Sequence, residues 1–524
     1  MTLRVRWLGK VAYRDALALQ RGLFEHGAED HLLLLEHPSV YTLGVRADLA
    51  NVLVPPASVG AELVRADRGG DVTYHGPGQL VGYPIVTVPG KRGGGMADTV
   101  AYVRSVADLL IDVLAELGVE GRWDERFPGV WVDDRKIAAI GVRLSRGRSM
   151  HGFALNVDPD LTMFEHIVPC GIADTQVASL RAEGVDTTMA DVIDLVVHHA
   201  STRWGDVERQ DVTLFQPPVE PTPVKLTGRL AQAGVTGGLA VSERKPEWLR
   251  APLRMDVDQR RLQRTMRELK LVTVCEEAGC PNLSECWSDG TATFMINGER
   301  CTRACGFCLV DTQHPEPLDA DEPERVAEAV ARMGLTHAVV TAVARDDLAD
   351  GGAAAFAATI DAIRRRRPGC AVEVLIPDCK GDTDALDAIF DAQPDILNHN
   401  VETVARLQRA VRPSAGYARS LAVLAHAKAS GLTTKSGLIL GMGETDDEVL
   451  GALADLRGIG VDIVTIGQYL RPSAKHLPVA RWVEPATFAA LKAAGEAMGI
   501  PHVEASPLTR SSYHARQAAE EATA

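Results

Sequence analysis

The chain has 524 residues, more than one ordinary domain holds, so we expect at least two domains. Hydrophobic residues make up 46% of it, enough for sizeable cores, and no apolar run approaches the length that crosses a bilayer. The formal net charge of −15 disfavours binding to nucleic acids and to anionic membranes. The N-terminus lacks the apolar core and cleavage site of a signal peptide, so we expect a cytoplasmic protein whose thiols stay reduced.

A glycine-rich segment follows two predicted strands in the first half of the chain. Residues 31–44 (HLLLLEHPSVYTLG) are typical of a strand, a turn and a second strand. Residues 68–79 (RGGDVTYHGPGQ) contain four glycines and a proline, which predicts a tight backbone that another group can approach closely. By itself, such a segment is more often a plain surface loop. Asp98 then caps an amphipathic helix that ends at Gly118 and contributes only to the core.

Two later segments carry reactive side chains. Residues 135–143 (RKIAAIGVR) predict a strand with Lys136 near its start. Residues 166–172 (HIVPCGI) place Cys170 between a proline and a glycine. A cysteine at such a turn is more exposed than one in an apolar strand, and a nearby cation would favour its thiolate. From these residues alone, a nucleophile and an inert cysteine both remain open.

Residues 31–180 resemble the octanoyltransferases of lipoate synthesis. RGGDVTYHGPGQL, the lysine-bearing strand, HGFALNV (residues 151–157) and the VPCGI turn occur in the order of that family. The resemblance implies a mixed α+β domain like the catalytic domains of biotin and lipoate ligases. It implies that Cys170 takes the acyl group as a thioester and that Lys136 lowers the pKa of this thiol. It also implies a substrate site lined by Arg68, Gly69, Gly70, Asp71, Val72, Thr73, Tyr74, His75, Ala139, Ile140, Gly141, Gly152, Phe153 and Ala154.

Residues 216–243 separate the two predicted domains, which span 1–215 and 244–524. Residues 216–223 (QPPVEPTP) are dense in proline, and residues 234–239 are small and flexible. We therefore predict an interdomain linker that is first semi-rigid and then loose. The alternative is an ordered arm that lies over one of the domains.

Six of the nine cysteines lie between residues 275 and 308, in two groups of three. Three thiolates on a 4Fe–4S cube leave one iron open to substrate or cofactor. Disulfides would need an oxidising compartment, and structural zinc closes a tetrahedron with four ligands, so both alternatives fit two triplets less well. The groups are Cys275, Cys280 and Cys286 (C-x4-C-x5-C), then Cys301, Cys305 and Cys308 (C-x3-C-x2-C). Cys370 and Cys379 lie outside both groups, and we interpret them as core or incidental.

Strand-like and helix-like segments alternate after Cys308. Such βα repeats imply a parallel sheet with helices outside, here a partial (β/α) barrel, so the whole chain is expected to be an α/β protein of two domains. The active site of such a barrel lies at the carboxyl ends of its strands. Predicted strands are 338–343, 372–376, 396–398, 435–440, 463–469 and 502–505, and predicted helices include 353–366, 382–391, 446–456 and 485–498.

The C-x3-C-x2-C spacing resembles the signature of radical SAM enzymes, and the second half as a whole resembles lipoyl synthases. The match includes KPEWLR (245–250), NHNVE (398–402), GLILGMGE (437–444) and RSSY (510–513). The resemblance implies a catalytic 4Fe–4S cluster on Cys301, Cys305 and Cys308, with S-adenosylmethionine on its open iron and its adenine held near Gly441 and Glu444. It also implies an auxiliary 4Fe–4S cluster on Cys275, Cys280 and Cys286, with Ser512, or else Ser511, as fourth ligand.

The two resemblances together predict a bifunctional enzyme of lipoate synthesis. Its first half would pass octanoate from octanoyl acyl carrier protein, through Cys170, to a lysine of a lipoyl domain. The acceptors implied are the lipoyl domains of 2-oxoacid dehydrogenases and the glycine cleavage H protein. Its second half would insert two sulfurs at carbons 6 and 8, with the auxiliary cluster as sulfur donor and a low-potential electron donor as partner. The alternatives are a chain in which only one half is active, or an inactive iron–sulfur scaffold protein.

Overall fold

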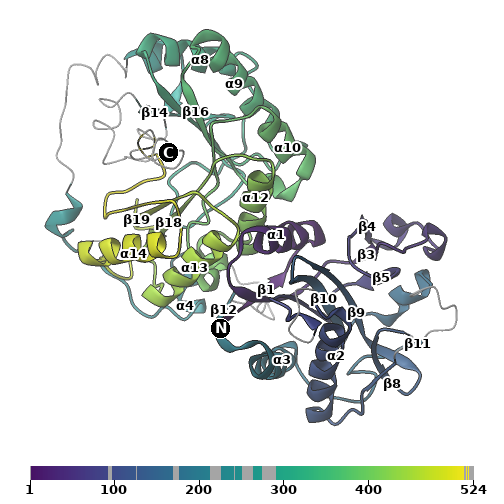
Figure 1. Cartoon of the computed structure of the whole chain (residues 1–524). Coiled ribbons are helices and arrows are strands. Elements are labelled where there is room, and N and C mark those ends of the chain that lie inside the picture. Colours follow the sequence, from purple (N-terminus) through teal and green to yellow (C-terminus); the bar gives the residue numbers. More distant parts are fainter. Residues whose placement is uncertain are drawn as a thin grey trace. The chain divides into compact units, whose positions relative to one another are not determined.

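The computed structural model describes residues 2–91, 97–124, 127–168, 176–212, 226–240, 242–250, 264–273, 291–512, 515 and 517. The chain forms two compact units, Met1–Val212 and Thr213–Ala524 (Figure 1). Cys170 lies outside the described residues, as do Cys275, Cys280 and Cys286. None of the described helices is both long and apolar enough to cross a membrane.

The first unit is built on a mixed sheet. Its described strands follow the order β12-β1-β2-β6-β10-β9-β8-β7, and β11 pairs with β9. β1 runs parallel to β2 and β12, whereas β2–β6, β6–β10 and β10–β9 are antiparallel. These strands are β1 (Thr2–Lys10), β2 (Asp30–Glu36), β6 (Gln79–Ile85), β7 (Arg122–Trp123), β8 (Gly129–Val132), β9 (Arg135–Ser145), β10 (Arg148–Asn156), β11 (Gln176–Val177) and β12 (Asp206–Asp211). A small sheet beside it contains β3 (Val40–Leu43), β4 (Glu62–Arg65) and β5 (Val72–His75).

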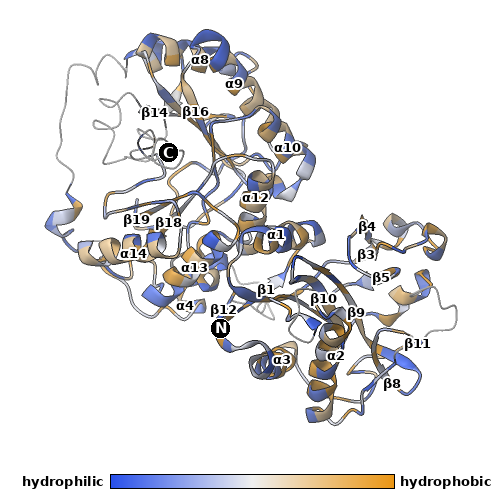
Figure 2. Ribbon diagram, viewed as in Figure 1, coloured by the Kyte–Doolittle hydropathy of each residue, from blue (hydrophilic) through white to orange (hydrophobic). Residues whose placement is uncertain are grey.

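Helices α1 (Tyr13–His26), α2 (Thr99–Glu116) and α3 (Met189–Trp204) accompany this sheet. α2 begins where the sequence predicts, because the Asp98 side chain accepts a hydrogen bond from Ala101 N. Hydrophobic and hydrophilic residues alternate along α2 (Figure 2), and its apolar residues share one core with α3 and the sheet. This mixed α+β unit confirms the predicted fold of the first half. Three short 3-10 helices are η1 (Leu49–Asn51), η2 (Pro56–Val59) and η4 (Leu161–His166).

Part of the predicted linker packs against the second unit. Residues 226–240 include η6 (Leu226–Gly228) and α4 (Arg229–Gln232), and Leu230 is only 2% exposed. Arg406 Nη1 donates to Ala233 O at 2.6 Å, and Leu239 N donates to Val479 O at 2.7 Å. Residues 213–225 lie outside the described residues, so the bounds of the linker stay a prediction.

The second unit is a single sheet in the order β13-β14-β15-β16-β17-β18-β19-β20. β13 is antiparallel to β14, and every later pair of neighbours is parallel. No pairing among the described strands closes this sheet, which confirms the predicted partial (β/α) barrel. The strands are β13 (Val272–Thr273), β14 (Thr291–Ile296), β15 (His337–Ala342), β16 (Ala371–Leu375), β17 (Ile396–Asn398), β18 (Thr434–Leu440), β19 (Ile463–Gln468) and β20 (His502–Ala505).

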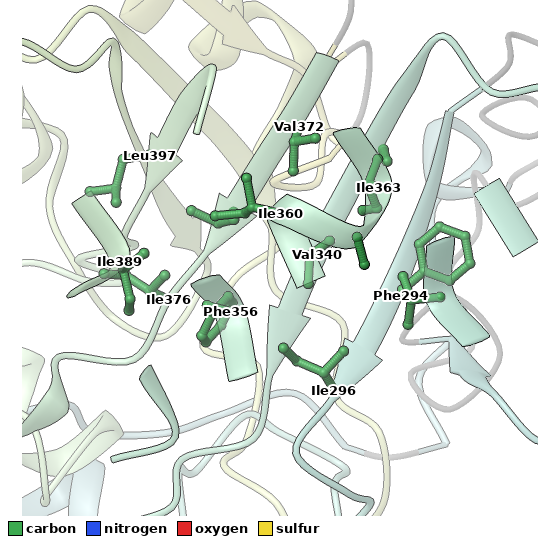
Figure 3. Packing of buried hydrophobic residues seen from close by; sticks show 14 of the residues in the cluster. Phe294, Ile296, Val340, Phe356, Ile360, Ile363, Val372, Ile376, Ile389 and Leu397 are labelled. Atoms are coloured by element: carbon green, nitrogen blue, oxygen red, sulfur yellow. The ribbon is translucent and has the colours of Figure 1, made fainter. Parts of the chain in front are cut away.

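Helices cover the outside of this barrel. Phe294 and Ile296 of β14 pack with Val340 of β15 and with Phe356 and Ile360 of α9 (Figure 3). Cys370 and Cys379 are buried in the same cluster, as the sequence predicts. The helices are α8 (Glu322–Met333), α9 (Ala353–Arg366), α10 (Thr383–Asp391), α11 (Gln408–Val411), α12 (Tyr417–Ala429), α13 (Asp446–Gly458) and α14 (Pro485–Ala497), with the 3-10 helices η7 (Glu247–Leu249), η8 (Cys379–Gly381) and η9 (Ala405–Leu407).

Candidate active sites

The glycine-rich segment of the first unit forms one wall of a pocket. Strands β9 and β10 contribute a second part of the lining. Every predicted substrate-binding residue lines this pocket except Tyr74, whose ring packs against Tyr41 and Phe164 instead. The pocket is lined by Tyr13, Arg68, Gly69, Gly70, Asp71, Val72, Thr73, His75, Tyr83, Pro128, Lys136, Ala139, Ile140, Gly141, His151, Gly152, Phe153 and Ala154.

Arg68 anchors the glycine-rich wall. Its side chain is 7% exposed, and Nη2 donates to Thr42 O at 2.6 Å and to Thr42 Oγ1 at 2.8 Å. Its Nη1 donates to Gly69 O at 3.0 Å, and Gly69 N donates to Val142 O of β9 at 3.0 Å. These bonds tie the segment to two strands, so it is a fixed wall rather than a plain surface loop.

Gly152 shows how closely the pocket strands approach each other. It pairs with Gly141 across β9 and β10. A Cβ atom at position 152 would lie 2.2 Å from Gly82 O and 2.5 Å from Pro84 Cδ. A side chain at this position would therefore push β6 and β10 apart and deform the pocket.

Lys136 lies near the start of β9, at one end of the pocket. It is 6% exposed, its Nζ donates to Pro128 O at 3.5 Å, and Nζ lies 4.8 Å from the centroid of the Trp131 ring. Its charge is thus held in a poorly solvated wall, where it would act strongly on a neighbouring thiolate. Because Cys170 lies outside the described residues, the pairing of Lys136 with this cysteine stays a prediction.

Sequence reasoning missed four lining residues, Tyr13, Tyr83, Pro128 and His151. Tyr13 begins an amphipathic helix, on its buried face, and Tyr83 lies in an apolar strand, so both have the pattern of core residues. His151 opens the HGFALNV segment that carries the family resemblance, and this was the one signal that could have found it.

The second candidate site is the loop that follows β14 and carries Cys301, Cys305 and Cys308. Backbone hydrogen bonds hold it at both ends, from Thr302 N to Ala344 O at 3.0 Å and from Gly306 N to Val411 O at 2.8 Å. Since Ala344 follows β15, the loop lies at the carboxyl ends of the strands, where barrel enzymes place their active sites.

The three cysteines of this loop supply the thiolates that a 4Fe–4S cluster needs. Among the described residues, no three His, Cys, Asp or Glu side chains converge closely enough to hold one ion. In a 4Fe–4S cluster each thiolate binds a different iron, so the sulfurs stand farther apart than around one zinc. Burial raises the pKa of Cys308 to about 12 and also raises that of Cys305, so bound iron would be needed to keep them as thiolates.

Arg303, between the first two cysteines, clamps the loop to the barrel. Its guanidinium donates to both carboxylate oxygens of Asp346, at 2.7 and 2.8 Å, and to Asp378 Oδ1 at 2.6 Å. Arg303 is 8% exposed and Asp378 is fully buried. Its backbone N–H also donates to Cys301 Sγ at 3.4 Å, so the residue both anchors the loop and contacts a cluster thiol.

The Gly441–Glu444 turn after β18 is shaped by its own glutamate. The buried Glu444 carboxylate accepts hydrogen bonds from Gly441 N at 2.5 Å and from Met442 N at 3.0 Å. Gly441 has φ +104°, and a Cβ there would lie 2.2 Å from Gln468 Nε2. Glu444 thus holds the turn in shape, which leaves the backbone of the turn to contact a ligand. Assignment of the adenine to this turn stays a prediction.

Polar side chains that follow β17 meet the C-terminal segment near the cluster loop. Asn400 Nδ2 donates to Ser511 Oγ at 2.8 Å and to Glu402 Oε1 at 3.1 Å. Burial raises the pKa of Glu402, whose carboxylate also acts on the thiols of Cys305 and Cys308. Ser511 is therefore engaged by the barrel, while Ser512 follows it in a half-exposed turn. Which serine binds iron stays a prediction.

Comparison with known proteins agrees with this division of the chain. The lipoyl protein ligase A/B catalytic domain matches residues 12–201, and the radical SAM superfamily matches residues 295–456. The lipoyl synthase of Rubrobacter xylanophilus is 58% identical over 280 residues, 53% of this chain and 87% of that protein. The lipoyl synthase of Mycobacterium avium is 55% identical over 281 residues, 53% of this chain and 92% of that protein. A crystal structure of lipoate–protein ligase A bound with ATP is 20% identical, with a TM-score of 0.36, over 41% of this chain and 90% of that one.

The barrel and its cysteine loop thus define a radical SAM enzyme, joined to a transferase domain of the lipoyl ligase type. The chain belongs to the lipoyl synthase family. A 4Fe–4S cluster and S-adenosylmethionine are the cofactors of this class, and the process that the two domains serve is lipoate biosynthesis.

Proposed function

We propose that this chain carries out two consecutive steps of lipoate synthesis on one acceptor. An octanoyl group is first transferred to a lysine of a lipoyl domain, and sulfur is then inserted at carbons 6 and 8 of that group. The observation that carries the proposal is the union, in one chain, of a lipoyl ligase-type pocket beside Lys136 with a lipoyl synthase barrel. The donor would be octanoyl acyl carrier protein, and the acceptors the lipoyl domains of 2-oxoacid dehydrogenases and the glycine cleavage H protein.

In the first step, the Cys170 thiolate attacks the carbonyl of the octanoyl thioester, and the carrier's thiol leaves with a proton. The acceptor lysine then attacks the enzyme thioester, the amide bond forms, and the Cys170 thiol is regenerated with the proton that the amine loses. Exchange between thioesters is near neutral in free energy, so the site needs mainly a good nucleophile and a positioned acceptor. Lys136 supplies the positive charge that favours the thiolate, and the fixed glycine-rich wall holds the acyl chain.

In the second step, Cys301, Cys305 and Cys308 would hold the 4Fe–4S cluster. With S-adenosylmethionine and a low-potential electron donor, this cluster would supply the radical chemistry that activates the octanoyl chain. Arg303 fixes the loop that carries these thiols, and Glu444 fixes the turn after β18. We further propose that Cys275, Cys280, Cys286 and Ser512 would hold a second 4Fe–4S cluster, and that this cluster would supply the sulfur.

One anaerobic experiment tests both steps. The reconstituted chain is mixed with an apo lipoyl domain, octanoyl acyl carrier protein, S-adenosylmethionine and a reductant, and the acceptor is followed by mass spectrometry. We expect the octanoyl form first and the lipoyl form later. A Cys170→Ala chain should leave the acceptor unmodified, and a Cys305→Ala chain should stop at octanoyl.

The other outcomes separate the rival functions. An acceptor that stops at octanoyl with the unaltered chain would show that only the first half is active. An unmodified acceptor, together with a full complement of iron and sulfide, would favour an iron–sulfur scaffold instead. The cytoplasm keeps thiols reduced, so in that compartment the cysteines of both triplets would be available to bind iron.

A further inference from the structure

One end of the acyl pocket is made of aromatic rings that carry polar atoms. The rings of Tyr13 and His75 are stacked with centroids 6.0 Å apart, and those of Tyr83 and His151 meet edge to face at 6.3 Å. All four residues line the pocket. Among the described residues, neither Tyr13 Oη nor His151 Nδ1 has a hydrogen-bond partner, although Tyr13 is 2% exposed and His151 is 1% exposed.

The surrounding groups determine whether each of these two atoms can donate or accept a hydrogen bond. His151 Nε2 lies 2.8 Å from Asp67 Oδ1, so the neutral ring carries its proton on Nε2 and presents an acceptor at Nδ1. Burial raises the pKa of Tyr13 to about 12, so its hydroxyl stays protonated and can donate as well as accept. Tyr13 and His151 belong to one cluster of rings, because His37 contacts both Tyr13, with centroids 5.1 Å apart, and Tyr83, with centroids 5.9 Å apart.

The other two rings, those of His75 and Tyr83, each have a hydrogen-bond partner in the protein. His75 Nδ1 lies 2.8 Å from Gln79 Oε1, and because Gln79 Nε2 donates to Asn156 at 2.9 Å, the histidine is the donor in the first bond. Tyr83 Oη lies 2.7 Å from His37 Nε2 and is the donor, because His37 Nδ1 donates to Val11 O at 2.8 Å. Tyr13 Oη and His151 Nδ1 are therefore the two fully buried polar atoms of these four rings that have no hydrogen-bond partner within the described part of the chain.

This polar end is separate from the reacting end. The Lys136 side chain runs along β9, since its Cε lies 3.2 Å from the position of a Cβ on Gly129 and Gly129 pairs with Ala139, which is two residues, or about 7 Å, before Gly141. Gly141 pairs with Gly152, the neighbour of His151, and Phe153 pairs with Gly82, the neighbour of Tyr83. An acyl chain whose carbonyl lies near Lys136 would thus point its methyl end at Tyr13 and His151.

We propose that Tyr13 and His151 hold an ordered water molecule that closes the acyl pocket and limits the length of the chain it accepts. A buried water needs polar partners, and a donor–acceptor hydroxyl beside an acceptor nitrogen supplies two of them. The methyl end of a chain that fits packs against this water. A longer chain must displace the water and leave both polar atoms buried without partners, which is unfavourable. The inference rests on the proposed acyl transfer, and it adds a length-determining pair outside the predicted substrate-binding residues.

Tyr13→Phe tests the inference because it removes one hydroxyl and little else. We would measure transfer of octanoyl and decanoyl groups from acyl carrier protein, and binding of free octanoate and decanoate by calorimetry. Without the hydroxyl the water is lost and its space admits methylenes, so the decanoyl-to-octanoyl ratio should rise about tenfold in both measurements. Tyr102→Phe is the matched control, since Tyr102 is 6% exposed, donates to Pro84 O at 3.4 Å and lies outside the pocket lining.

Three results would overturn the inference. They are an unchanged ratio in Tyr13→Phe, an equal rise in Tyr102→Phe, and a high-resolution structure of the unaltered chain with octanoate that shows no water between Tyr13 and His151. The last result does not depend on the folding of a variant. If the unaltered chain binds octanoate but transfers none, the proposed function fails, while the binding ratios still decide this inference.

Discussion

A buried ion pair inside the barrel leads to a quantitative prediction. Glu373 of β16 and Lys435 of β18 are both fully buried, and Lys435 Nζ lies 3.0 Å from Glu373 Oε1. Asn398 Nδ2 donates to Glu373 Oε1 at 3.2 Å, and His337 Nε2 lies 3.5 Å from Glu373 Oε2. We predict that Lys435→Met strongly destabilises the second unit, because it leaves the carboxylate of Glu373 buried beside weaker partners.

Two routes give a similar magnitude for this change. Removal of one partner from a buried ion pair typically costs about 3–5 kcal/mol. Burial by itself raises the pKa of Glu373, but Lys435 and His337 outweigh it and lower that pKa to about 2. Against an unfolded-state value of about 4.3, this shift of about two units corresponds to about 3 kcal/mol at pH 7.

Urea unfolding at pH 7, followed by circular dichroism and by hydrogen exchange of peptides from β16 and β18, measures the effect. Lys492→Met is the matched control, since Lys492 is 40% exposed and lies 3.6 Å from Glu496, and it should cost less than about 1 kcal/mol. A Lys435→Met/Glu373→Met double variant should recover most of the loss, because no charge is then buried alone. A loss below about 1 kcal/mol in Lys435→Met, or no recovery in the double variant, would refute the reasoning.

Four further predictions follow from contacts described above. The pKa of Glu373 is lowered in the folded state, so its contribution to the free energy of unfolding is fully present above about pH 4.3 and is lost as the pH falls toward 2. Acid unfolding should show this loss of stability, and Glu373→Gln should lose less stability over the same pH range. Lys136→Met should slow octanoyl transfer at least about 100-fold and leave sulfur insertion into a pre-octanoylated acceptor unchanged; an equal loss in both assays would contradict its assignment. Arg303→Lys should lower the iron and sulfide retained per chain, because lysine cannot reproduce a forked contact with two carboxylates, and normal retention would count against its anchoring role. Gly152→Ala should weaken octanoate binding at least about tenfold, since its Cβ would lie 2.2 Å from Gly82 O; unaltered affinity would show that the strands move apart freely.

Much of the barrel could be predicted from local patterns. The helix predicted at 353–366 is α9 with the same bounds, and the strand at 396–398 is β17. The helix predicted at 382–391 begins one residue later, because the Asp382 side chain accepts a hydrogen bond from Ala385 N and is the N-cap. Such signals depend on residues within a few positions of one another, so one chain is enough to find them.

The linker shows where local patterns are insufficient. Small residues such as Gly234 and Gly238 predict a loose segment, yet the described part of this range packs on the barrel. Val235 lies against Gly443, where a Cβ would come within 2.5 Å of its side chain. Composition indicates how flexible a segment is by itself, whereas contacts with residues distant in sequence determine whether the folded protein holds it in place.

The sequence by itself determined the two fold classes, the family and the residues with reactive groups, because these depend on periodicity and on fixed spacings along the chain. Only the tertiary structure placed Tyr13 of α1, Tyr83 of β6 and His151 of β10 in one pocket wall, and joined Arg303 to Asp378. These residues lie tens of positions apart and in sequence have the pattern of ordinary core or loop residues. Their roles arise from burial and hydrogen-bond partners, which exist only once the strands and helices have packed.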